Sequence, residues 1–140
     1  MTRAEILALI ERRQAAANAH DVEALTLLHA EDGVVESPMA GTHQGREAIG
    51  EVYRAFSTAF PDAAFTTDDV IVDGDRAVLL STVSGTDTGG FMGLPPTRKQ
   101  FKMQAVLLYA FKDDHIAHER RIYDFTGLLV QIGVLKARPA

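Results

Sequence analysis

The 140-residue chain contains no cysteine. This absence excludes a disulfide framework, a thiolate nucleophile and a zinc–thiolate site. The histidines do not show the spacing of metal ligands, and neither a glycine-rich phosphate loop nor a nucleophile elbow occurs. We therefore expect a protein that uses no metal and no cofactor.

Long basic runs are also missing. Lysine and arginine number 14 against 19 acidic residues, a net charge of −5, and no basic cluster exceeds two residues. A nucleic-acid or anionic-membrane partner is therefore not expected. No apolar run approaches the ~18 residues of a membrane span, and charged residues interrupt the first segment, which argues against a secretory signal. The expected location is the cytoplasm.

The composition is that of an ordinary globular protein. Hydrophobic residues make up 46% and charged residues 24% of the chain. A chain of this length buries roughly two-thirds of its unfolded surface, so we expect one domain over residues 1–140.

Three helices are expected in the first 61 residues. Thr2 and Glu5 have the spacing of a capping box, and Asp21 is a suitable N-cap for a second helix. A third helix opens at Gly45 and stops at Pro61. The first helix presents an apolar stripe formed by Ile6, Leu7, Ile10, Gln14 and Ala17.

The rest of the chain has a strand pattern. A short strand is expected at 33–38, and long strands rich in β-branched and aromatic residues follow from residue 70 to 125. Hairpin turns are expected at 73–75 and 112–114. Helices followed by long antiparallel strands indicate an α+β fold, with a curved sheet wrapped on the helices to form a cone. Small-molecule pockets favour the mouths of such sheets.

Two sequence blocks resemble a known family. Residues 85–97 read GTDTGGFMGLPPT, and residues 124–133 read DFTGLLVQIG. Together with the helix opening GREAI at 45–49, they resemble the SnoaL-like polyketide cyclases of the nuclear transport factor 2-like superfamily. The resemblance implies a cone-shaped α+β barrel of three to four helices on a strongly curved, mostly antiparallel sheet. It also implies a homodimer that makes contact through the outer sheet face.

The resemblance places Asp124 at the bottom of an apolar pocket as general acid and base. A carboxyl group among apolar neighbours is a better base near neutral pH, because burial disfavours its charged form. It could remove a proton next to a carbonyl group and return one after intramolecular aldol closure of an apolar polycarbonyl compound. The alternative is structural, since Asp124 also precedes an expected helix and aspartate is a common N-cap.

Asp87 is the second candidate catalytic residue. If it shares a cavity with Asp124, like-charge repulsion would divide the work between an acid and a base. Alternatively, Asp87 accepts hydrogen bonds from nearby backbone amides. Asp87 stands where the family usually carries histidine, and Arg120 where tryptophan is common.

Further residues are candidates for substrate binding. On a strand, His118 and Arg120 would share the face of Asp124; alternatively, both lie at the surface or in a dimer contact. Gln104 sits among apolar neighbours on a central strand and needs a polar partner. The expected apolar wall includes Tyr53, Phe91, Met92 and Tyr109, with Phe56, Phe60, Met103 and Leu107, although the favoured interpretation is that most of these side chains are simply core.

Three functions remain open on this sequence. The first is a cofactor-independent cyclase or isomerase. The second keeps the fold but hydrolyses an epoxide, with Arg120 flanked by Asp124 and Asp87, or isomerises a ketosteroid-type compound. The third is a non-catalytic module for small-molecule binding or dimerisation, because fold does not determine function.

Overall fold

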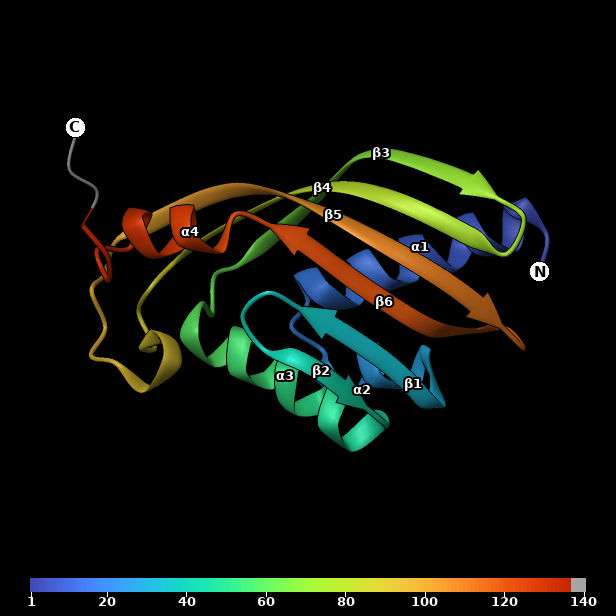
Figure 1. The fold of residues 1–140 in the computed structure, drawn as a ribbon, viewed down its shortest axis with the longest axis horizontal. Coiled ribbons are helices and arrows are strands. Elements are labelled where there is room, and N and C mark those ends of the chain that lie inside the picture. The colour runs from blue at the N-terminus through green and yellow to red at the C-terminus, as the bar shows by residue number, and fades with distance from the viewer. Residues whose placement is uncertain (137–140) are drawn as a thin grey trace.

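The computed structural model describes residues 1–136 and confirms the expected α+β cone (Figure 1). The helices are α1 (Arg3–Asn18), α2 (Val22–Leu27), α3 (Arg46–Ala59) and α4 (Phe125–Gln131), with a 3-10 turn, η1 (Phe91–Gly93). The strands are β1 (His29–Ser37), β2 (Gly41–Gln44), β3 (Ala64–Asp73), β4 (Arg76–Thr86), β5 (Gln100–Lys112) and β6 (His115–Tyr123). They form one sheet in the order β2-β1-β6-β5-β4-β3. Only the β1–β6 pair is parallel.

The helix starts follow the capping residues. The Thr2 hydroxyl accepts a hydrogen bond from the Glu5 amide at 3.2 Å, and the Asp21 carboxylate accepts one from Ala24 at 3.0 Å. Both satisfy amides that have no partner within the helix. Helix α3 starts after Gly45, whose φ of +91° favours glycine, and ends before Pro61.

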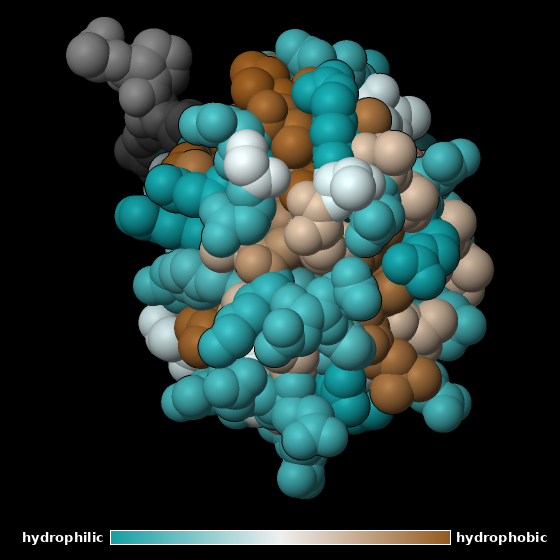
Figure 2. Space-filling model, turned by 90° about the vertical axis from the view of Figure 1, so that its right-hand side faces the viewer, coloured by the Kyte–Doolittle hydropathy of each residue, from teal (hydrophilic) through white to brown (hydrophobic). Residues whose placement is uncertain are grey.

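Two tight turns join the long strands. Asp73 pairs with Arg76, and Lys112 pairs with His115. Asp113 and Asp114 both have positive φ, as a two-residue hairpin of type I′ requires. Figure 2 shows the end of the molecule that carries these turns, and its surface is mainly hydrophilic with scattered apolar patches.

Helices α1, α2 and α3 cover one face of the curved sheet (Figure 1). At one end of this concave face the core contains Ile6, Leu9, Leu79, Leu107 and Ile116. At the other end, next to α4, it contains Phe60, Phe91, Phe101, Leu128 and Ile132. Among residues 1–136, we find no helix with the length and apolar character needed to cross a membrane.

A bulge in β6 decides which of its side chains face the helices. Ala110 of β5 pairs with His118, whereas the next residue pairs with Ile116, so β6 contains one extra residue. A bulge of this kind shifts the side-chain alternation by one position. Ile116 and Glu119 are therefore both fully buried on the concave side, although they are three residues apart.

Beyond the bulge, Glu119, Arg121 and Tyr123 point to the concave face, while Arg120 and Ile122 are exposed on the outer face. The expectation that the face of Arg120 and Asp124 lines the cone is therefore wrong.

Candidate functional site

A cavity lies between the three helices and the concave face of the sheet. Its volume is about 60 Å³. The apolar wall includes Leu25, Phe56, Phe65, Val83, Met103 and Leu107. The polar groups come from Arg13, Tyr53, Ser57, Ser81, Arg121 and Tyr123. Strand register explains this lining, because Leu107 pairs with Arg121 and Ala105 with Tyr123.

The cavity has room for a few water molecules, whereas pockets for drug-sized ligands measure roughly 300–1,000 Å³. A multi-ring compound would therefore have to displace part of the wall. Met39 and Met103 line the cavity, and methionine side chains repack easily because they are unbranched. Met39 and Met103 are therefore the side chains of the wall best suited to move aside for a larger ligand.

The polar end of the cavity contains a buried ion-pair cluster. Arg13 of α1 donates from Nε to Oε1 of Glu119 at 2.9 Å. Arg121 of β6 donates from Nε to Oε2 of the same carboxylate at 2.9 Å. Glu119 is fully buried and Arg13 nearly so. One carboxylate is therefore shared by two guanidinium groups that both line the cavity.

Two aromatic side chains complete this cluster. The Tyr53 hydroxyl lies 3.3 and 3.2 Å from the two oxygens of Glu119 and donates to that carboxylate. Nε2 of His29 lies 3.0 Å from the Tyr53 oxygen, so in the neutral ring Nε2–H is the donor to Tyr53. The Arg121 guanidinium also lies 4.8 Å from the centre of the Tyr53 ring, a favourable cation–π distance.

The charges of the cluster leave one positive charge in excess. Burial alone would raise the pKa of Glu119, but Arg13 and Arg121 outweigh it and hold that pKa far below its usual range. Burial would lower the pKa of each arginine, yet Glu119 raises both. Burial also raises the pKa of Tyr53 and lowers that of His29 to about 4. Two cations, one anion and two neutral rings therefore share the site at neutral pH.

Not every N–H group of the Arg121 guanidinium makes a hydrogen bond. Its Nη2 atom lies 2.9 Å from Oε2 of Glu119, close enough for an ion pair. The same oxygen already accepts from Nε, and no N–H of Nη2 makes a hydrogen bond to any residue in 1–136. Nε and Nη2 therefore both face Glu119, and the donor capacity that Arg121 retains lies at its third nitrogen, Nη1, which makes no hydrogen bond to any residue in 1–136.

The buried His29 makes stability depend on pH. Its pKa falls from 6.5 to about 4 on folding, so between these values the unfolded chain binds a proton that the folded chain does not. Stability from neutral His29 is complete above pH 6.5 and is lost as the pH falls toward 4, by up to about 3 kcal/mol. We expect His29→Gln to show a flatter decline than the wild type in urea unfolding between about pH 7.5 and pH 4.5. Parallel declines would contradict this prediction.

Asp124 does not reach the cavity. Its side chain is exposed and accepts a hydrogen bond from the Gly127 amide at 2.8 Å, which caps α4. Asp124 is therefore an N-cap, the alternative role given above. Its expected position at the bottom of the pocket is wrong.

Asp87 is buried but belongs to the loop between β4 and β5. Oδ1 accepts from the Gly90 amide at 3.2 Å, and Oδ2 accepts from the amide and hydroxyl of Thr97 at 3.1 and 3.0 Å. These bonds hold the two sides of the 87–97 loop together. Asp87 does not line the cavity, so the structure does not bring it together with Asp124 there.

Three other candidates lie on the outer face of the sheet. Arg120 and Gln104 are exposed. His118 is half-buried, and its Nε2 makes a hydrogen bond of 2.6 Å with Glu36 Oε2. None of the three lines the cavity, which follows from their strand faces and from the bulge in β6.

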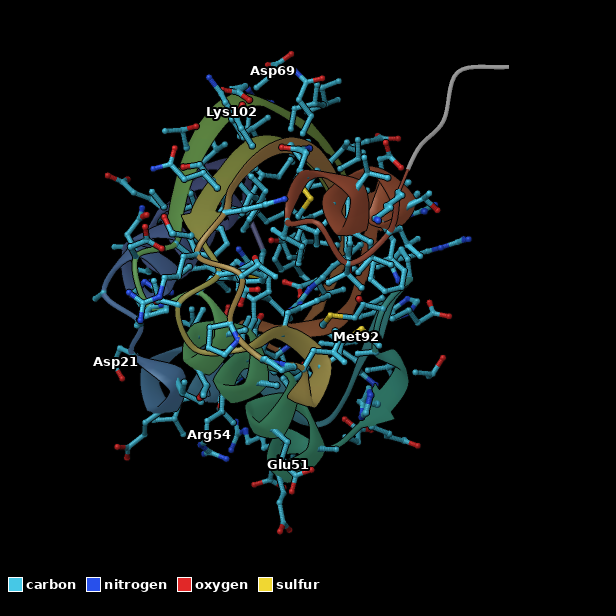
Figure 3. All side chains as sticks on the ribbon, turned by 90° about the vertical axis from the view of Figure 1, so that its left-hand side faces the viewer. Asp21, Glu51, Arg54, Asp69, Met92 and Lys102 are labelled. Carbon is cyan, nitrogen blue, oxygen red and sulfur yellow. The ribbon has the colours of Figure 1, made fainter. Side chains whose placement is uncertain are left out.

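The expected apolar wall is partly correct. Tyr53, Phe56, Met103 and Leu107 line the cavity. Tyr109 is buried beside the cluster, with the Arg13 guanidinium 5.9 Å from its ring centre. Phe91 packs in the core near α4. Met92 is 61% exposed on the adjoining loop (Figure 3).

Sequence reasoning missed the ion-pair cluster itself. Arg13 follows Leu9 and Ile10 at helical spacing, which places it on the buried stripe of α1. A cation in that position requires a buried anion, and this was the signal that could have revealed the site. No group of three or more His, Asp or Glu side chains within residues 1–136 is arranged to hold a metal ion.

The helices, the curved sheet and the cavity on its concave face define the nuclear transport factor 2-like class of proteins. The model of the SnoaL-like polyketide cyclase family matches residues 8–132. The chain therefore belongs to the SnoaL-like polyketide cyclase family.

Solved structures support the same relationship. TsrD from Streptomyces laurentii is 27% identical with a TM-score of 0.85, over 96% of this chain and 99% of that one. AclR from Streptomyces galilaeus, a candidate hydroxylase, is 26% identical with a TM-score of 0.85, over 99% and 87%. IdmH from Streptomyces antibioticus, a candidate polyketide cyclase, is 29% identical with a TM-score of 0.77, over 90% and 96%. The search of curated proteins found no match.

Proposed function

We propose that this protein is a cofactor-independent enzyme that binds an apolar carbonyl compound in the cavity and stabilises its enolate. The observation that carries this proposal is the excess positive charge of Arg13 and Arg121 over Glu119 at the end of a mainly apolar pocket. A fixed cation in a water-poor site stabilises a negative charge that develops during the reaction.

The chemistry follows from this charge. A substrate carbonyl oxygen beside Arg121 makes the neighbouring C–H bond more acidic, because a nearby cation favours the anionic form of any acid. Glu119 is a poor base, since two arginines and Tyr53 already engage it. Water in the cavity accepts the proton. The enolate carbon attacks a second carbonyl group of the same molecule, and the resulting alkoxide takes the proton back from the hydronium formed in the first step, which regenerates the water and completes an aldol ring closure.

The same arrangement bears on the alternative reactions. Epoxide hydrolysis on this fold would use an arginine between two carboxylates that activate water. The cluster is the reverse, with one carboxylate between two arginines. A binding module is the second candidate, favoured by the observation that no aspartate or glutamate in the described part of the chain (1–136) lines the cavity.

Proton exchange tests the proposal without knowledge of the natural substrate. An aryl β-keto ester dissolved in D₂O exchanges its acidic C–H protons, and NMR follows the loss of their signal. We expect the protein to accelerate this exchange well above the buffer rate. If the rate equals that of buffer, the enzyme proposal fails and the binding module is favoured.

We also propose that the protein is a homodimer joined through the outer sheet face. Val106 pairs with Ile122 there, and Ile122 is 47% exposed. Half-buried Val78, Leu80 and Leu108 on the adjacent strands extend this apolar surface. An exposed apolar surface of this kind is typical of an interaction site.

Light scattering checks the dimer. We expect the wild type to have twice the 15.2 kDa of one chain. Ile122→Glu should be a monomer, because the change places a charge at the centre of the contact. Leu27→Glu is the matched control, since Leu27 is 55% exposed on α2, away from the sheet. A monomeric wild type would contradict this proposal.

A further inference from the structure

We infer that the ligand of this cavity is itself an anion, an apolar carboxylate whose charged group binds the two arginines. This inference rests on the proposed function for the position of the site, and it specifies the substrate class.

The first argument is charge balance. Arg13 and Arg121 both line the cavity, and one buried carboxylate serves both of them. The chain as a whole has a net charge of −5, so this positive site is a local feature and not part of a basic surface. An uncompensated buried charge is unfavourable; an anionic ligand would offset it, and the N–H groups of the two arginines would then serve both the carboxylate and the enolate oxygen of the same ligand.

The second argument is hydrogen-bond geometry. Nε and Nη2 of Arg121 both lie 2.9 Å from Oε2 of Glu119, whereas the third nitrogen, Nη1, makes no hydrogen bond to any residue from 1 to 136. A guanidinium group is matched by a carboxylate, which accepts from neighbouring N–H groups in one plane. A neutral carbonyl oxygen would satisfy fewer of these donors and would leave the charge unbalanced.

The third argument comes from the rest of the wall. No acidic side chain within residues 1–136 lines the cavity, and the nearby carboxylate of Glu119 is already engaged by the two arginines and Tyr53. Away from the arginines, the lining is dominated by side chains such as Phe56, Met103 and Leu107, which favour an aryl or alkyl body. The ligand therefore combines one anionic end with an apolar remainder.

A pair of isosteric probes tests this inference. The probes are 2-naphthoate and 2-naphthamide, which have the same shape and differ in charge. Calorimetric titration of the wild type should give a dissociation constant about tenfold lower for the carboxylate or better, as expected for a charge-assisted hydrogen bond. Equal binding of the two, or tighter binding of the amide, would overturn the inference.

Three variants test whether Arg121 causes the preference for 2-naphthoate over 2-naphthamide. Arg121→Gln should abolish it, and Arg120→Gln, the neighbouring arginine on the outer face, should leave it intact. Arg121→Lys keeps the charge and provides a second test if the glutamine variant does not fold. It should retain part of the preference. A full preference in both Arg121 variants would overturn the inference.

The binding test of this inference and the proton-exchange test of the proposed function can fail independently. Accelerated proton exchange without a preference for naphthoate would overturn this inference and leave the enzyme proposal standing. A preference for naphthoate without accelerated exchange would support an anion-binding pocket and remove the enzyme proposal.

Discussion

Replacing Glu119 with glutamine is expected to lower the free energy of unfolding by about 3–5 kcal/mol. The change removes the only anion of the cluster and leaves two guanidinium groups buried against a neutral amide. Both arginines keep their charge, because the pKa of an arginine stays above neutrality even when it is buried. The loss is therefore the cost of uncompensated buried charge, and not that of one hydrogen bond.

Urea unfolding at neutral pH measures this effect. Glu36→Gln is the matched control, because Glu36 makes a hydrogen bond with His118 at the surface, where both side chains are about two-fifths exposed. Such surface pairs contribute at most about 1 kcal/mol. A loss for Glu119→Gln no larger than that of the control would show that the cluster does not carry the buried charge described here.

Arg121→Gln is expected to reduce the catalysed proton exchange by about 100- to 1,000-fold, the usual effect of removing one group that stabilises a developing oxyanion. Asp124→Asn is expected to leave the rate unchanged. Asparagine is an equally good N-cap, so this variant keeps α4 while it removes the carboxylate.

The variants Arg121→Gln and Asp124→Asn distinguish an active site at the arginine cluster from one at Asp124. The family resemblance predicts Asp124 as the acid and base, and that role remains a prediction for the exchange assay to decide. Far-ultraviolet circular dichroism confirms that each variant is folded, and Arg120→Gln controls for the loss of an arginine from β6. A rate lost in Asp124→Asn and retained in Arg121→Gln would contradict the site proposed here.

Much of the fold could be predicted from local signals. The caps at Thr2 and Asp21 mark where α1 and α2 begin, and the stop at Pro61 follows from proline chemistry. The two hairpin turns were also identified, because strand patterns on both sides point to them. These signals lie within a few residues of the feature they determine.

The site could not be predicted in the same way, because one residue of register decides it. Strict alternation from the buried Ile116 would direct Arg120 toward the helices. The bulge between Ile116 and His118 directs Glu119 and Arg121 there instead. Nothing in the sequence around Ala117 marks this bulge, since no glycine or proline occurs in β6.

Asp87 and Asp124 were chosen as candidate catalytic residues because of where they stand in the sequence. Asp87 and Asp124 stand in the two blocks that most resemble the family, and both are engaged in capping backbone amides. A capping role and a catalytic role look alike in sequence, because both place an aspartate at the end of a strand. Part of the apolar wall was expected from the sequence, whereas the spacing of Arg13 after Leu9 and Ile10 on α1 was a signal for the charged end of the site that was not used.

The most direct test of the site is a crystal structure of the protein with 2-naphthoate bound. The account predicts the carboxylate within about 3 Å of the Arg121 guanidinium, with the rings against Phe56 and Leu107 and the wall displaced to admit them. A ligand seated on the 87–97 loop or beside Asp124, with the arginine end of the cavity unchanged, would contradict the account.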